Sequence, residues 1–259
     1  MRYFLPGVFA FSALFASIDA RRKTSTSKTL SVDFGDYPTS GEPDMEQWLA
    51  NEGLLVSDQT IGGTIEHTLT PDNVDIQDGA LRLKVTGQSG NGTVLAAQIA
   101  AAADDILYGT FSVVTKASPV AGTCQGIFTY ADDNHEVDIE LLSSYYTTGY
   151  ENEDGAVSAG LEFTNQPLTT TVGETNTVVP YGFDPTADFH EYTIEWTPTY
   201  SKFHVDGELK TTFTTNVPSK ASQFMLNNWS NGNVLWSAGP PTEDSYFLVK
   251  SIDLKYTTA

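Results

Sequence analysis

The sequence contains a single cysteine, Cys124, and few basic residues. Its 13 Lys and Arg face 33 Asp and Glu, for a formal net charge of −20, and only eight of the basic residues follow Gly41. One cysteine excludes an internal disulfide, so packing alone must hold the fold, and we expect Cys124 to be a small buried residue without a nucleophilic role. The scarcity of basic residues argues against a nucleic-acid partner, because binding to phosphates requires a positively charged surface.

Long apolar runs are also lacking, apart from the first twenty residues. MRYFLPGVFAFSALFASIDA begins with a basic residue, continues with an apolar stretch and ends in small residues at Ala20. This pattern is typical of a secretory signal peptide, and the run is too short and too interrupted to predict a membrane span. We therefore expect a secreted protein, extracellular or in the cell wall, with no membrane partner. The Ser/Thr-rich stretch 21–40 is expected to be a flexible linker.

The remaining residues, 41–259, are expected to form one all-β domain. They contain short segments in which apolar and polar residues alternate, such as TFSVVTK (110–116) and HEVDIELL (135–142), and turn signals such as Asp206-Gly207 separate these segments. Many short strands without a convincing amphipathic helix predict two packed antiparallel sheets. About 40% of the chain is hydrophobic, which is enough for a core and excludes a disordered chain. We expect a monomer.

Three carboxylates alternate with aliphatic residues in HEVDIELL. Glu136, Asp138 and Glu140 occupy every second position, so on a strand they share one face and the aliphatic residues share the other. Like charges on one face repel each other, which costs stability unless function requires them.

Glycoside cleavage is one chemistry that requires such a row. A retaining glycosidase uses two carboxyl groups about 5–5.5 Å apart, one as the nucleophile and one as the acid/base. On a flat strand the Cα atoms of Glu136 and Glu140 would lie about 13 Å apart, so the prediction demands a bent, concave strand. Asp138 between them would raise the pKa of a neighbouring carboxyl, which suits a general acid.

Two other interpretations of the row stay open. It could be a solvated acidic strand face with no function. The run ADDNHEVD (131–138) also offers oxygen ligands for a structural Ca²⁺, although a regularly alternating strand is a poor cage for that ion.

HEVDIELL, placed after GIFTY (126–130), resembles the catalytic strand of glycoside hydrolase family 16, and most closely its lichenase branch of endo-β-1,3-1,4-glucanases. FHEYTIEWTPTYSKFHVDGELK (189–210) and MLNNWSNGNVLW (225–236) are similar to family segments in the same order. The resemblance covers most of residues 80–256. It implies a jelly-roll sandwich of two curved antiparallel sheets, as in concanavalin A-like lectins and glucanases.

The resemblance also implies roles for individual residues. Glu136 would be the nucleophile, Glu140 the acid/base and Asp138 the assisting acid. In the sugar cleft, Phe128 and Tyr130 match the family's aromatic pair on the preceding strand. Asn227, Trp229 and Trp236 match its Asn-x-Trp…Trp set. Glu162 stands where lichenases carry a Gln that contacts sugar. Aromatic faces stack on the apolar faces of sugars, although each aromatic could instead pack in the core.

The chain departs from the lichenase pattern in three places. Gln98-Ile99-Ala100 stands where lichenases usually carry Glu-x-Arg, and Asn134 stands where they usually carry a Trp before the nucleophile. Their usual disulfide is absent too. These departures leave the substrate preference open.

These observations lead to one functional expectation and two alternatives. We expect a secreted, retaining endo-β-glucanase that hydrolyses β-1,3/1,4- or β-1,3-glucan without a cofactor and whose partner is this polysaccharide. The alternatives are a cell-wall transglycosylase on the same scaffold and a non-catalytic, lectin-like glucan-binding protein. The intact row of carboxylates argues against the second alternative, because a binding module has no need of them.

Overall fold

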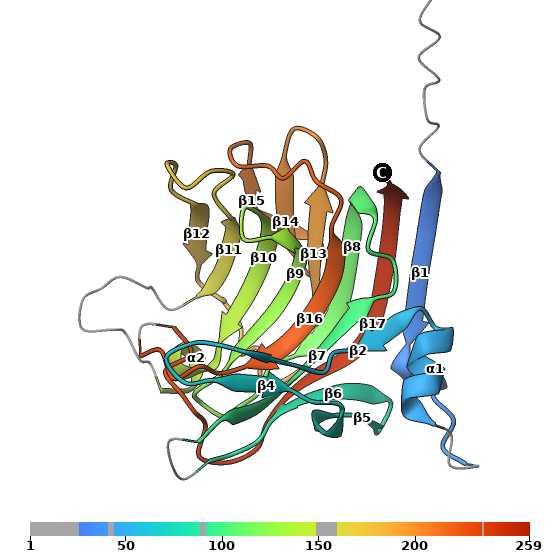
Figure 1. Cartoon of the computed structure of the whole chain (residues 1–259), viewed down its shortest axis with the longest axis vertical. Coiled ribbons are helices and arrows are strands. Elements are labelled where there is room, and N and C mark those ends of the chain that lie inside the picture. Colours follow the sequence, from blue (N-terminus) through green and yellow to red (C-terminus); the bar gives the residue numbers. More distant parts are fainter. Residues whose placement is uncertain (1–25, 41–43, 89–91, 149–159, 235) are drawn as a thin grey trace, which may run out of the picture.

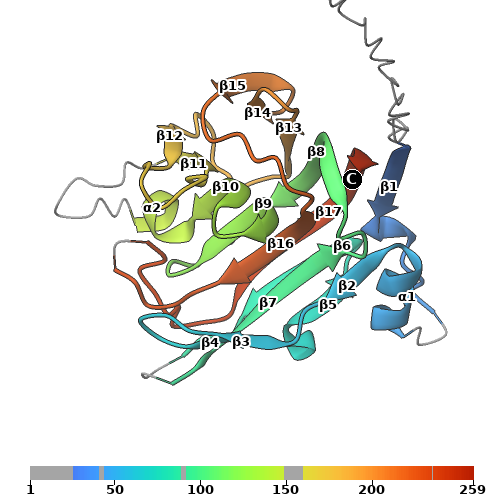
Figure 2. The ribbon, with the colours of Figure 1, turned by 45° about the horizontal axis from the view of Figure 1, so that its top comes forward.

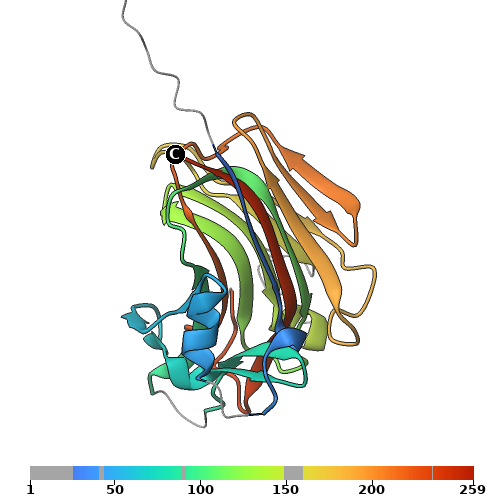
Figure 3. The same cartoon turned by 90° about the vertical axis from the view of Figure 1, so that its right-hand side faces the viewer.

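A computed structural model describes residues 26–40, 44–88, 92–148, 160–234 and 236–259. The expected signal peptide lies outside the described residues. The described residues form two β-sheets that pack face to face (Figures 1 and 3).

The first sheet carries the carboxyl-terminal strand near its centre. Its spatial order is β15 (Glu208–Phe213), β14 (Ser201–Val205), β13 (His190–Trp196), β8 (Ile106–Lys116), β17 (Ser245–Thr258), β6 (Ala80–Val85) and β5 (Val74–Gln77), with β1 (Ser27–Asp33) also paired to β17.

The second sheet carries the row of carboxylates. Its spatial order is β12 (Thr175–Val179), β11 (Leu161–Asn165), β10 (His135–Leu142), β9 (Cys124–Asp132), β16 (Gln223–Trp229), β7 (Val94–Ala101), β4 (His67–Leu69) and β3 (Gln59–Ile61), with β2 (Leu54–Val56) also paired to β7. Among the strands that the structure describes, all pairs are antiparallel except β4 with β7. The predicted all-β sandwich is confirmed, and its long strands are visibly curved (Figure 3).

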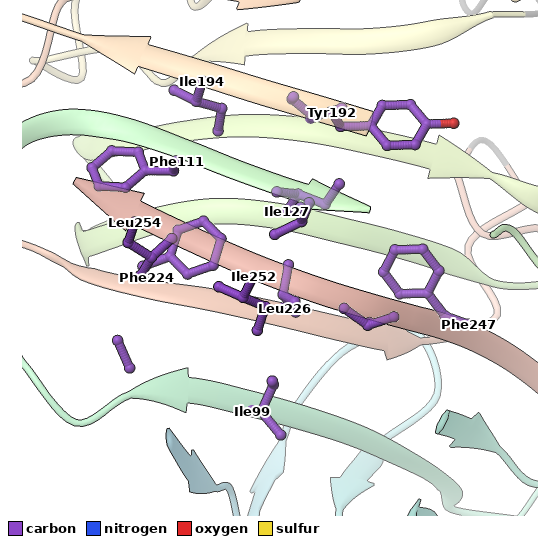
Figure 4. Close-up of a cluster of buried hydrophobic side chains, with 14 of the residues drawn as sticks. Ile99, Phe111, Ile127, Tyr192, Ile194, Phe224, Leu226, Phe247, Ile252 and Leu254 are labelled. Carbon is purple, nitrogen blue, oxygen red and sulfur yellow. The ribbon is translucent and has the colours of Figure 1, made fainter. Parts of the chain in front are cut away.

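The core lies between the two sheets and follows from the alternation in the sequence. Phe111 of β8, Ile194 of β13 and Leu254 of β17 point inward from the first sheet, and Ile127 of β9 and Phe224 of β16 point inward from the second (Figure 4). Phe111 and Phe224 stack across the interface, with ring centroids 5.6 Å apart. Burial of these side chains supplies the main driving force for folding, since no disulfide contributes.

The prediction of a flexible linker over residues 21–40 is wrong for most of residues 26–40, the part of this stretch that the structure describes. Ser27–Asp33 forms β1, which pairs with β17 along its whole length, and a 3-10 helix, η1 (Phe34–Asp36), follows it. Val32 and Phe34 are buried in the core. The segment therefore belongs to the folded domain, because two apolar anchors and a full strand of backbone hydrogen bonds outweigh its Ser/Thr-rich composition.

Two short α-helices were not expected from the sequence. The first is α1 (Met45–Asn51), which is capped by the Asp44 carboxylate accepting a hydrogen bond from the Gln47 N–H at 3.0 Å, and it buries Leu49. The second is α2 (Ser143–Thr148), which follows β10 directly. A second 3-10 helix, η2 (Pro71–Asn73), precedes β5. Within the described ranges, no helix is long and apolar enough to cross a membrane.

Candidate active site

The alternation along β10 separates the carboxylates from the core, as the sequence predicts. Val137, Ile139 and Leu141 are fully buried between the sheets. Asp138 is only 3% exposed, whereas its neighbours in the row, Glu136 and Glu140, are partly exposed. The three acids therefore lie on the face of the second sheet that points away from the core.

Strand register places the predicted aromatic residues beside the acids. On β9, Tyr130 lies opposite Glu136, and Phe128 lies opposite Asp138. Because directly opposed side chains of an antiparallel pair share a face, these two aromatics flank the row. The sequence-based placement of Phe128 and Tyr130 next to the carboxylates matches this register.

Asn227 and Trp229 come from the next strand, β16, which lies beside β9 (Figure 2). Asn227 is opposite Gly126, which in turn is opposite Glu140. A Cβ atom on Gly126 would come within 2.6 Å of Asn227 Oδ1, an oxygen that accepts a hydrogen bond from the Gly126 N–H at 3.1 Å. Glycine is therefore needed here, since it lets Asn227 lie close to the backbone beside Glu140.

A cleft of about 530 Å³ opens over this face of the second sheet. Of the residues proposed from the sequence, seven line it, namely Phe128, Tyr130, Glu136, Asp138, Glu140, Asn227 and Trp229. Trp236 also reaches the row, because its indole N–H donates a hydrogen bond to Glu140 Oε1 at 3.3 Å.

Glu162 lies beside the row but does not line the cleft. It is opposite Glu140 on β11 and is only 2% exposed. Its side chain therefore shares the sheet face of the row, and the sugar contact expected at this position stays a prediction. Its Oε1 has no hydrogen-bond partner among the described residues.

Sequence reasoning missed part of the cleft wall. Gln98 of β7 lies opposite Asn227 and donates a hydrogen bond to Ser57 Oγ at 2.9 Å, and His67 of β4 stacks on Trp229 with centroids 5.4 Å apart. The other missed lining residues are Gln59, Ile61, Gly62, Leu69, Gly126, Met225 and Asn231. Gln98 was visible only as a departure from the lichenase pattern. His67 comes from β4, and the β4–β7 parallel pairing that brings it to the cleft is not encoded in local periodicity.

Burial controls the protonation of the row. Burial, with the charge of Glu140, raises the pKa of Glu136 to about 7. Burial, with the charges of Glu136 and Glu140, raises the pKa of Asp138 well above its usual range. A hydrogen bond between Glu136 and Asp138 lowers the pKa of Glu136 and raises that of Asp138. Asp138 thus holds a proton and donates it in a hydrogen bond to an ionised Glu136. The Gln166 amide also donates to Asp138 Oδ2, at 3.0 Å.

Glu140 has a different environment. Burial raises its pKa to about 7, while hydrogen bonds from Cys124 and Trp236 lower it and the charge of Glu174 raises it. The Cys124 thiol is buried, as expected, and its Sγ lies 3.2 Å from Glu140 Oε1. The pKa values of Glu136 and Glu140 both lie near 7, so each carboxyl can gain or lose a proton near neutral pH.

Two carboxylates of the acidic run 131–138, offered above as Ca²⁺ ligands, have partners within the protein. Asp132 pairs with His135 Nδ1 at 2.9 Å and with Lys220 Nζ at 2.8 Å, and Asp133 accepts a hydrogen bond from Tyr130 Oη at 2.8 Å. No group of three or more His, Cys, Asp or Glu side chains that could hold a metal ion occurs in the part of the chain that the structure describes.

The buried Glu162 gives a prediction for stability. Burial, with the charges of Glu140 and Glu174, raises its pKa to about 8, above the value of about 4.3 expected in the unfolded chain. The folded state therefore binds the extra proton between these values, and the free energy of unfolding falls as pH rises through this window. We expect Glu162→Gln to have a free energy of unfolding similar to the parent at pH 4.5 and up to about 4 kcal/mol greater at pH 8.

Urea denaturation at pH 4.5 and pH 8 measures this difference. Glu191→Gln, the same change at an exposed position of β13, is the matched control and should shift neither midpoint. An equal effect of Glu162→Gln at both pH values would contradict a raised pKa in the folded state.

The comparisons with known proteins agree with this geometry. The family model of "Glycosyl hydrolases family 16" matches residues 62–246, which contain the whole row and the lining strands β4, β7, β9, β10 and β16. The chain belongs to glycosyl hydrolases family 16. The predicted family and the jelly-roll fold class are thereby confirmed.

The proteins to which the chain is similar include β-glucanases. The chain is 30% identical over 181 residues to a "Beta-glucanase" of Paenibacillus polymyxa, covering 64% of this chain and 66% of that protein, just under two thirds of its length. A solved "Bacillus licheniformis beta-glucanase" superposes with a TM-score of 0.67 at 25% identity, covering 92% of this chain and 100% of the other. The fold is also shared, at 22% identity and a TM-score of 0.58, by a structure described as "Apo Crh5 transglycosylase", with 88% of this chain and 84% of the other covered.

Proposed function

We propose that this family 16 protein is a secreted, retaining endo-β-glucanase that cleaves β-1,3/1,4- or β-1,3-glucan by double displacement. The observation that carries the proposal is the row Glu136, Asp138 and Glu140, which lines an open cleft. The two outer carboxyls have different hydrogen-bond partners, Asp138 for Glu136 and Cys124 with Trp236 for Glu140. The relatives named β-glucanase support the substrate class.

The first step forms a covalent intermediate. Ionised Glu136 attacks the anomeric carbon, while protonated Glu140 gives its proton to the glycosidic oxygen as the carbon–oxygen bond breaks. Asp138 keeps its proton and donates a hydrogen bond to Glu136, which holds the nucleophile ionised and oriented. The released sugar carries the transferred proton.

The second step returns the enzyme to its starting state. Glu140, now ionised, removes a proton from a water molecule that attacks the anomeric carbon, and the bond to Glu136 breaks. Two inversions leave the configuration of the sugar unchanged. Aromatic and amide side chains near the row, namely Phe128, Tyr130, Asn227, Trp229 and Trp236, hold the sugar rings through stacking and hydrogen bonds.

A substrate panel tests the proposed function. Purified protein should release reducing sugar from barley-type mixed-linkage glucan or from laminarin at initial rates at least roughly tenfold above those on xyloglucan or chitin, because the proposed substrates are β-glucans without xylosyl branches or N-acetyl groups. Detectable binding to both β-glucans without any product over a long incubation would contradict the proposal and favour a glucan-binding protein.

The same panel separates hydrolysis from transglycosylation. With labelled oligosaccharide acceptors present, a hydrolase releases mainly unlabelled short products, because water takes the sugar from Glu136. Label in most of the products would instead show that acceptor sugars outcompete water, and the transglycosylase function would replace the hydrolase.

A further inference from the structure

Glu140 accepts two hydrogen bonds on the same carboxyl oxygen. The Cys124 thiol lies 3.2 Å from Oε1, and the Trp236 indole nitrogen lies 3.3 Å from the same atom. The two donors approach from different parts of the chain, since Cys124 begins β9 and Trp236 lies in the segment between β16 and β17. In the described part of the chain, no hydrogen bond to Oε2 is found.

The thiol is held at this place by packing. Cys124 is fully buried and lies opposite both Leu142 of β10 and Trp229 of β16. Together with Leu142 and Tyr145 it forms a small apolar cluster, against which Trp229 and Trp236 pack. Packing in an apolar cluster needs no hydrogen-bond donor, so packing alone does not account for a thiol that reaches Glu140.

We propose that Cys124 and Trp236 act as positioning residues that hold Oε1 of Glu140, so that Oε2 is the oxygen that gives and takes the proton. This inference rests on the acid/base role of Glu140 under the proposed function. Two donors on Oε1 disfavour a proton there, so in the acid form the proton occupies Oε2. From Oε2 it passes to the glycosidic oxygen, and the same oxygen later receives a proton from water.

Glu140 lies among other acidic residues. Glu136 and Asp138 lie on its own strand, Glu162 lies opposite it on β11, and the charge of Glu174 also reaches it. Burial and the charge of Glu174 raise the pKa of Glu140, whereas the thiol and the indole lower it. Without the two donors Glu140 would give up its proton less readily to the glycosidic oxygen in the first step.

Removal of one donor at a time tests this arrangement. In Cys124→Ala and in Trp236→Phe the basic limb of the pH profile of kcat/KM, which reports the acid/base in the free enzyme, should move to higher pH by roughly half a unit to one unit. The acidic limb, which reports Glu136, should stay in place. Cys124→Ser retains a donor and should keep the parent's basic limb, whereas Cys124→Val retains the packing and should behave like Cys124→Ala.

A role confined to packing would give a different result. It would lower the melting temperature or the amount of active protein in Cys124→Ala and leave both limbs unmoved, and that outcome would overturn the proposal. A basic limb at the same pH in Cys124→Val and Cys124→Ser would overturn it as well, since only the serine variant retains a hydrogen-bond donor. Thermal melts of the Val and Ser variants provide the check on folding.

Carboxyl titration separates this inference from the proposed function. ¹³C NMR of Glu-labelled protein follows Glu140 directly, with its resonance assigned from its loss in Glu140→Gln, and requires no turnover. A raised pKa of Glu140 in Cys124→Ala supports the donor role even if no glucan is cleaved. An unchanged pKa in both Cys124→Ala and Trp236→Phe overturns it even if the parent protein is an active glucanase.

Discussion

Glu136→Gln is expected to abolish glucan hydrolysis while leaving the fold intact. Glutamine has nearly the same shape as glutamate, but its amide cannot form the covalent bond to the anomeric carbon, so we expect kcat to fall by roughly 10⁴-fold or more. The fold should tolerate the change because Glu136 lies at the cleft rather than in the core, and because burial already opposes its charge. Initial rates on the preferred β-glucan and the far-ultraviolet circular dichroism spectrum measure the two effects.

Two further variants serve as controls for the loss of activity in Glu136→Gln. Glu191→Gln makes the same change on the exposed side of β13 and should retain full activity. Asp138→Leu keeps a side chain of similar shape between the two glutamates but removes the hydrogen bond to Glu136, so an assisting role predicts a partial loss of kcat. Retention of parental kcat in Glu136→Gln would remove this residue from the chemistry and with it the assignment of the nucleophile.

The local part of the site was predictable from the sequence. Period-two alternation alone places Glu136, Asp138 and Glu140 on one face and Val137 and Ile139 on the other, and the structure has them so. Alternation is a property of each strand and needs no knowledge of its neighbours. The all-β class follows from the same signal, repeated along the chain.

What depends on pairing between distant strands was not predictable in this way. The approach of Cys124 to Glu140 requires the β9–β10 register, and the position of His67 requires a parallel pairing of β4 with β7. The prediction of a linker from the Ser/Thr content of residues 21–40 was also wrong, because every residue of β1 pairs with β17. Sheet order arises from contacts far apart in the sequence, which local patterns do not specify.

Glu140→Ala is expected to separate the two chemical steps. Loss of the general acid should lower kcat/KM on β-glucan by roughly 10³–10⁴-fold, because the alcohol leaving group needs a proton. A dinitrophenyl β-glucoside of a short glucan has a leaving group that needs none, so its first step should slow by less than about tenfold. The glycosyl-enzyme on Glu136 should then accumulate, since no base activates water for the second step, and a burst of dinitrophenol would reveal it.

Azide assigns the two carboxyls through product stereochemistry. In Glu140→Ala, azide enters the space of the lost side chain, needs no base, and displaces Glu136 from the opposite face, so it should restore turnover and give the β-glycosyl azide. In Glu136→Ala the anion would instead take the place of the nucleophile and give the α-glycosyl azide after a single inversion. Opposite anomers from the two variants, read by ¹H NMR, follow from a nucleophile at Glu136 and an acid/base at Glu140. The reverse pattern would exchange their roles, and then the two donors on Oε1 of Glu140 would be holding the nucleophile rather than the acid.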